Sequence, residues 1–185
     1  MTNLIEEIAG ISVEMPPLET ETARQEVTRI LDRLVTEKGR DYVYPYAGQG
    51  GNDCMYVERI GDNPSDVFPE ENNYYPVPVE ELAPSCIVGH LLVKAGMTVS
   101  DVLTMGNTDA WETLWTNYGF LIPNDWAEDE ELMQALSWLQ NDQDTTVPWG
   151  VAVDRFKFTL ENGVTRETRD AAIAQFRYDG QDDAA

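Results

Sequence analysis

The feature that most constrains the fold is a series of segments in which apolar side chains recur every three or four residues. This spacing places the apolar side chains on one face of an α-helix. The clearest segment extends from Glu21 to Lys38 and is followed by Gly39, a residue type that commonly ends helices. Further segments of this kind are predicted at residues 84–95, 111–118, 125–140, 148–160 and 165–177, with a short capped helix starting at Thr98. We therefore expect a mainly helical domain of about six helices.

Two short segments have the composition of β-strands. Tyr42–Tyr44 and Cys54–Val57 contain mostly aromatic and β-branched residues, and a glycine-rich stretch at residues 48–53 separates them. This arrangement predicts one small β-hairpin. The expected fold class is therefore α+β, mainly α.

The chain divides into three parts by composition. Residues 1–18 end in two prolines and lack a regular pattern, so we expect a flexible N-terminal arm. Residues 19–178 hold the periodic segments and are expected to form a single globular domain, followed by an acidic tail at residues 179–185. The first ten residues carry Glu6 and Glu7 where a secretory signal would carry Lys or Arg, and no uninterrupted apolar run approaches 18 residues. A cytoplasmic protein with no membrane contact is expected.

The charge of the chain is strongly negative and unevenly distributed. Asp and Glu number 34 against 12 Lys and Arg, a formal net charge of -22, and Lys94 is the only basic residue between Ile60 and Asp154. Such a chain repels phosphates and anionic lipids and attracts basic partners, so direct nucleic-acid binding is not expected. High solubility and adaptation to a salt-rich cytoplasm explain the same composition equally well.

Three separated segments resemble a group of uncharacterised proteins encoded by phages of actinobacteria. The first is Tyr56-Val57, the second is the run Pro84 to His90, and the third includes Leu139-Gln140 and Gln143-Asp144 and ends in Pro148-Trp149-Gly150-Val151-Ala152. The resemblance covers roughly residues 40–157, with a longer loop at residues 61–78 than that pattern has. The group has no known function, so the resemblance implies a phage origin and no activity.

A cysteine and a histidine form the most chemically specific pair in the sequence. Cys86 and His90 are four residues apart on one predicted helix, and Cys54 could supply a third zinc ligand, with Glu80 or Glu81 as a fourth. The paired C-x-x-C spacing of structural zinc sites is absent, and a cysteine in an apolar helix usually behaves as a small hydrophobic residue. The same pair could act as nucleophile and base, but its helix is apolar on most sides. We therefore expect no catalytic residues, no metal and no cofactor.

Carboxylates near the end of the 125–140 helix have some likeness to a calcium-binding loop. The residues are Asp142 and Asp144, with Asn141 beside them, but the central glycine and the distal glutamate of such a loop are missing. A dedicated calcium site is not expected there.

The candidate partner-binding residues come from two parts of the chain. Tyrosines next to carboxylates in the irregular 60–78 loop suit an interface, because tyrosine is frequent at binding hot spots. A run of carboxylates opens the 125–140 helix. The candidates are Glu70, Glu71, Tyr74, Tyr75, Asp125, Glu128, Asp129, Glu130 and Glu131.

These observations favour a non-enzymatic acidic phage accessory protein. It would act in the cytoplasm of the infected bacterial host and bind a basic surface of a host or phage protein. One alternative is a DNA mimic whose carboxylates occupy phosphate positions on a nucleic-acid-binding protein. Another is a small metal-binding protein or enzyme that uses Cys54, Cys86 and His90. The oligomeric state stays open.

Overall fold

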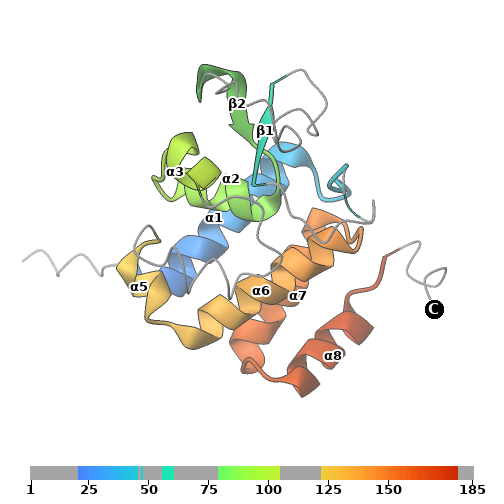
Figure 1. The fold of residues 1–185 in the computed structure, drawn as a ribbon. Coiled ribbons are helices and arrows are strands. Elements are labelled where there is room, and N and C mark those ends of the chain that lie inside the picture. Colours follow the sequence, from blue (N-terminus) through green and yellow to red (C-terminus); the bar gives the residue numbers. More distant parts are fainter. Residues whose placement is uncertain (1–20, 46, 48–55, 61–78, 105–121, 179–185) are drawn as a thin grey trace, which may run out of the picture.

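The structure is a computed structural model that describes residues 21–45, 47, 56–60, 79–104 and 122–178 (Figure 1). Seven α-helices and two short strands lie within these ranges. They are α1 (Ala23–Lys38), β1 (Val57–Arg59), β2 (Leu82–Pro84), α2 (Ile87–Lys94), α3 (Val99–Thr104), α5 (Asn124–Ala127), α6 (Glu130–Asp144), α7 (Trp149–Asn162) and α8 (Arg166–Gln175), with a 3-10 helix at Val79–Glu81. The mainly helical class predicted from the sequence is confirmed.

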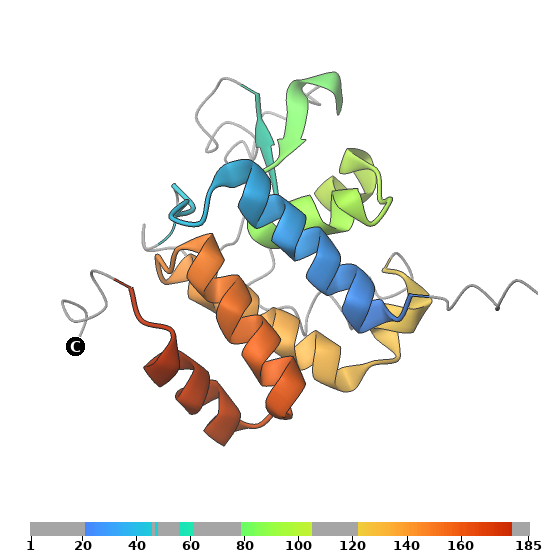
Figure 2. The ribbon, with the colours of Figure 1, turned by 180° about the vertical axis from the view of Figure 1, so that it is seen from behind.

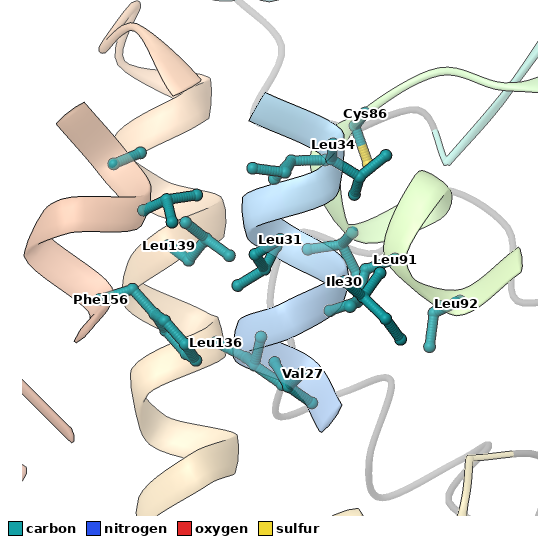
Figure 3. Packing of buried hydrophobic residues seen from close by; sticks show 14 of the residues in the cluster. Val27, Ile30, Leu31, Leu34, Cys86, Leu91, Leu92, Leu136, Leu139 and Phe156 are labelled. Atoms are coloured by element: carbon teal, nitrogen blue, oxygen red, sulfur yellow. The ribbon is translucent and has the colours of Figure 1, made fainter. Parts of the chain in front are cut away.

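Helix α1 lies at the centre of the packing. It contacts α2 on one side and α7 on the other, while α6 packs along α7 and α8 packs on the outside of α7 (Figures 1 and 2). Leu31 points toward Leu139 of α6, and Ile30 points toward Leu91 of α2 (Figure 3). The core therefore has two halves that share one helix.

The sequence of α1 explains why this helix forms and where it starts. Thr22 and Gln25 make a capping box, in which each side chain bonds the backbone N–H of the other residue. The buried side chains include Val27, Leu31 and Leu34, which are all fully inaccessible to solvent. Burying each such side chain stabilises the fold by roughly 1.5–3 kcal/mol. The helix is therefore held by its apolar stripe, as the periodicity predicts.

The predicted β-hairpin is wrong in its pairing. Val57 pairs antiparallel with Pro84, and Arg59 pairs with Leu82, so the partner of β1 comes from later in the chain. Residues 42–44 are not a strand, and Cys54 lies outside the described residues.

Residues 40–42 instead cover the start of α7. That helix begins after Pro148, whose side chain makes no cap hydrogen bond. The backbone N–H of Trp149 donates to the carbonyl oxygen of Tyr42 over 2.9 Å, and Gly150 N–H donates to Arg40 over 2.9 Å. Two N–H groups that a helix start leaves without partners are thus satisfied by a loop, which explains the non-strand conformation there.

Other boundaries differ from the sequence prediction in smaller ways. Pro84 was expected to introduce a helix, but it belongs to β2, and α2 begins at Ile87 with Cys86 as its N-cap. The predicted helix at residues 111–118, the arm at residues 1–18 and the tail at residues 179–185 lie outside the described residues. None of the described helices combines the length and the apolar character needed to cross a bilayer.

Gly89 marks the closest approach between α2 and the β1 region. A Cβ atom at this position would lie 2.1 Å from the carbonyl oxygen of Tyr56. The obstacle is backbone, so it cannot move aside as a flexible side chain would. The position therefore accepts only glycine without a shift of α2.

We expect Gly89→Ala to lower the free energy of unfolding by about 2 kcal/mol or more, because it overpacks this contact. Chemical denaturation followed by circular dichroism measures the change. Gly163→Ala is the control, since its Cβ would meet open space and only the positive φ of 90° is unfavourable. A loss below about 1 kcal/mol in Gly89→Ala would contradict the close-approach interpretation, whereas Gly163→Ala reports the cost of the positive φ alone.

Candidate functional site

Five of the predicted partner-binding carboxylates lie together where α5 meets α6. We call Asp125, Glu128, Asp129, Glu130 and Glu131 the α5–α6 corner. Asp125 belongs to α5, Glu128 and Asp129 form the connection, and the last two open α6. Their position at the start of a helix is favourable, because the N-terminal end of the helix dipole is positive.

Only some of the carboxylates in the α5–α6 corner are free of a basic partner within the described residues. Arg24 of α1 donates from Nε to Asp129 over 2.6 Å and from Nη2 to Glu131 over 2.8 Å. Asp129 also accepts the N–H of Leu132 as the N-cap of α6. The hydrogen bond from Arg24 holds the pKa of Asp129 below its usual value. Two of the five carboxylates, those of Asp129 and Glu131, are therefore already paired with Arg24.

The remaining three carboxylates of the corner face solvent. Asp125, Glu128 and Glu130 are exposed. A second contact fixes the surface that carries them, because the buried Trp126 donates its indole N–H to Glu26 of α1 over 3.0 Å. The corner is thus a fixed acidic surface joined to α1 at two points.

The other predicted interface residues come from the segment at residues 61–78. Glu70, Glu71, Tyr74 and Tyr75 lie outside the described residues.

The excess of negative charge is spread unevenly between the described and the remaining residues. All 12 Lys and Arg of the chain fall in the described ranges, together with 20 of the 34 acidic residues. Many of these basic residues form ion pairs, such as Lys157 with Asp32 and Arg40 with Asp154. The described residues are therefore much closer to charge balance than the whole chain.

Cys86 and His90 have separate roles in the structure. The Cys86 thiol is fully buried and accepts the N–H of Gly89 as the N-cap of α2. The His90 ring lies edge-on to Trp149, with ring centroids 5.7 Å apart. Burial lowers the pKa of His90 to about 4, with the neighbouring Lys38 and Lys94 acting in the same direction.

A metal site is not supported by the part of the chain that the structure describes. No group of three His, Cys, Asp or Glu side chains within it could hold a metal ion. Cys54, the third ligand considered from the sequence, lies outside that part.

The three segments that carry the resemblance meet in the structure. The Tyr56 hydroxyl donates to Gln140 over 3.3 Å, and the backbone N–H of Ile87 donates to the side-chain oxygen of Gln143 over 2.5 Å. Together with the ring contact between His90 and Trp149, these bonds join the residue before β1, helix α2, the end of α6 and the start of α7. Their residues are buried or half-buried, so this polar network holds the two halves of the core together.

Asp144 is a titratable group at the edge of this network. Its carboxylate accepts the side-chain N–H of Gln143 over 3.1 Å. Burial raises its pKa to about 6, and the amides of Gln143 and Gln140 oppose the shift only in part. The Gln140 amide nitrogen makes no hydrogen bond of ordinary geometry within the described residues. The negative form of Asp144 is therefore poorly solvated in the fold.

Asp142 occupies a buried ion cluster. Arg169 donates to both of its oxygens over 2.5 and 2.7 Å, and Arg155 donates to one over 3.1 Å. Arg155 also donates from Nε and Nη2 to the carbonyl oxygen of Phe176. The cluster ties α8 and the residue after it to α6 and α7. In this structure Asp142 has the role of a counterion for arginine.

The sequence contained one signal for this cluster. Arg155 lies at the edge of the apolar stripe of α7, between Val153 and Phe156 in the sequence, and an arginine that is buried there requires a buried acceptor. Which carboxylate meets it depends on the crossing of α6 and α7.

Comparison with known proteins gives no relative from which a role could be transferred. No family model matches the chain, and neither the curated proteins nor the solved structures contain a match.

We expect Asp142→Asn to lower the free energy of unfolding by about 3–5 kcal/mol, because it leaves two buried guanidinium groups without their counterion. Asp154→Asn is the control. It breaks the ion pair with Arg40, whose side chain is 61% exposed, and should cost about 1 kcal/mol or less. Denaturant titration measures both. Similar losses in the two variants would argue against a structural role of the buried cluster.

Asp144 should make the fold less stable as the pH rises from 4 to 7. Its folded pKa of about 6 lies above the ordinary value, so the folded state binds the proton more tightly and loses this advantage as the proton leaves. Asp144→Asn should remove the loss and raise stability at pH 7.5 by on the order of 1–2 kcal/mol, given that the carboxyl is partly solvent-screened. Melting curves at pH 4.5 and 7.5 for both proteins measure the difference. A gain from the variant that is equal at both pH values would contradict this assignment.

Proposed function

We propose that this chain is a non-enzymatic accessory protein of a phage that binds a basic surface of a host or phage protein through the α5–α6 corner. The observation that carries the proposal is the set of three exposed carboxylates, Asp125, Glu128 and Glu130, on a surface fixed to α1. The phage origin and the cytoplasm of the infected host as the place of action rest on the resemblance alone.

The contacts from α1 matter for binding because they reduce its entropic cost. A charged surface that is already ordered loses little conformational freedom when a partner docks. Arg24 holds one side of the corner through Asp129 and Glu131, and Trp126 anchors the other through Glu26. Exposed charges of this kind mainly accelerate association and choose between partners, and salt weakens their effect.

DNA mimicry is less well supported than binding of a basic protein surface. A mimic needs rows of unpaired carboxylates at phosphate-like spacing. In the part of the chain that the structure describes, Asp32, Asp129, Asp142 and Asp154 are instead paired with Lys or Arg. The mimic would therefore have to rely on the other carboxylates, such as the exposed Asp125, Glu128 and Glu130.

The combined variant Asp125→Asn, Glu128→Gln and Glu130→Gln tests the proposal. We expect about tenfold weaker capture of basic proteins from an actinobacterial lysate at low salt, because each exposed charge contributes about 0.5 kcal/mol. Quantitative mass spectrometry of the captured proteins across a salt series measures the effect. In the unmodified protein, capture should fall as salt rises.

The matched control changes the same residue types on another surface. Glu161→Gln, Glu167→Gln and Asp170→Asn remove three exposed carboxylates from the ends of α7 and α8. Capture should stay close to that of the unmodified protein. Equal losses in both triple variants would reduce the proposal to a general effect of net charge, and salt-independent capture would reject it.

A further inference from the structure

A groove of about 490 Å³ lies between α1 and α7. The two helices run side by side in opposite directions, as Figure 2 shows, because the start of α7 is bound by the loop that follows α1. The lining residues are Arg24, Gln25, Thr28, Arg29 and Asp32 of α1 and Lys157, Leu160 and Glu161 of α7. They occupy one face of each helix, so the groove is a continuous strip parallel to both axes.

The surface of this α1–α7 groove is mostly carbon although its residues are mostly charged. Leu160 supplies an apolar side chain, and the long stems of Arg29 and Lys157 supply aliphatic surface while their charged ends bind Glu21 and Asp32. The Nζ of Lys157 bonds Asp32 over 2.9 Å and joins the two walls. An occupant of this groove would therefore be held mainly by burial of apolar groups.

The chain reaches α1 beside this groove. Glu21, the first described residue, accepts from Arg29 Nε over 3.0 Å and from Nη2 over 3.2 Å. Arg29 lies eight residues further along and is part of the groove wall. The ion pair therefore places the side chain of Glu21, the residue to which residues 1–20 are attached, beside the groove wall.

The composition of residues 1–20 fits a groove of this kind. They contain eight large apolar side chains, four glutamates and no Lys or Arg. The apolar residues are Met1, Leu4, Ile5, Ile8, Ile11, Val13, Met15 and Leu18. A segment with so many apolar groups gains free energy by covering them, roughly 25 cal/mol for each Å² removed from water.

The length of the segment is sufficient for it to fold back. The wall from Arg24 to Asp32 covers about 12 Å of helix, whereas ten extended residues span about 33 Å. Because residues 1–20 are tethered at the groove, their effective concentration there is on the order of millimolar. The tether favours them over a free ligand of equal affinity.

From these observations we propose that residues 1–20 dock in the α1–α7 groove of their own chain, with their apolar side chains against Leu160 and the stems of Arg29 and Lys157. The docked segment would cover the side of α1 that faces away from α2. This inference does not depend on the function proposed for the α5–α6 corner.

Hydrogen–deuterium exchange of the full-length protein tests the docking. Amides within residues 4–15 should exchange about tenfold more slowly than in an unprotected peptide. Leu160→Asp in the groove should return them to the unprotected rate. Ile8→Asp should do the same from within the segment, and it leaves the groove and the described core unchanged, so the test does not depend on the stability of one variant.

Val43→Asp is the matched control, because Val43 is an exposed apolar residue outside the groove, with 39% of its surface accessible. It should leave the protection of residues 4–15 unchanged. Unprotected exchange in the unmodified protein would overturn the proposal, and so would protection that survives both Leu160→Asp and Ile8→Asp. Protection that grows with protein concentration, together with a dimeric mass, would assign the groove to a second copy and overturn docking within one chain.

Discussion

The packing of α1 between α2 on one side and α6 and α7 on the other is the interaction that fixes the positions of the other helices. Leu31 faces α6 and Ile30 faces α2, so one helix is shared between the two halves of the core (Figure 3). The same helix presents Arg24 and Glu26 to the α5–α6 corner and Arg29 to the groove beside α7. Because α1 cannot shift without opening both halves, it fixes the relative positions of the surfaces considered for function.

Carboxylates have structural as well as surface roles in this strongly acidic chain. Asp142 neutralises two buried arginines, and Asp129 both caps α6 and binds Arg24. Asp144 contributes in the opposite sense, since burial opposes its ionisation and raises its pKa. Net charge therefore overstates the negative surface of the described residues. We propose that a partner would meet the smaller set of exposed carboxylates in the α5–α6 corner.

Sequence periodicity identified α1, α6, α7 and α8 because each has an apolar stripe or a recognisable terminal residue. It placed β1 near Val57 but gave it the wrong partner, because the strand that pairs with β1 begins at Leu82, 25 residues after Val57. Tyr42 looked like a strand residue, yet its carbonyl caps α7. In the candidate site, the position of the acidic run at the start of a helix could be predicted. The binding of two of its carboxylates by Arg24 could not, because that contact joins residues more than 100 positions apart.

The sequence by itself determined the mainly helical class, the starts of α1, α7 and α8 to within about a residue or two, and the unusual charge. These properties depend on neighbours within one or two helical turns, where spacing and capping residues act directly. The sequence did not determine the bounds of α6, because the segment predicted as one helix at residues 125–140 is divided between α5 and α6. Only the tertiary structure decided which carboxylates are exposed, which are neutralised, and how Tyr56, Gln140 and Gln143 meet. Those outcomes depend on how helices cross, which is set by the packing of many side chains at once.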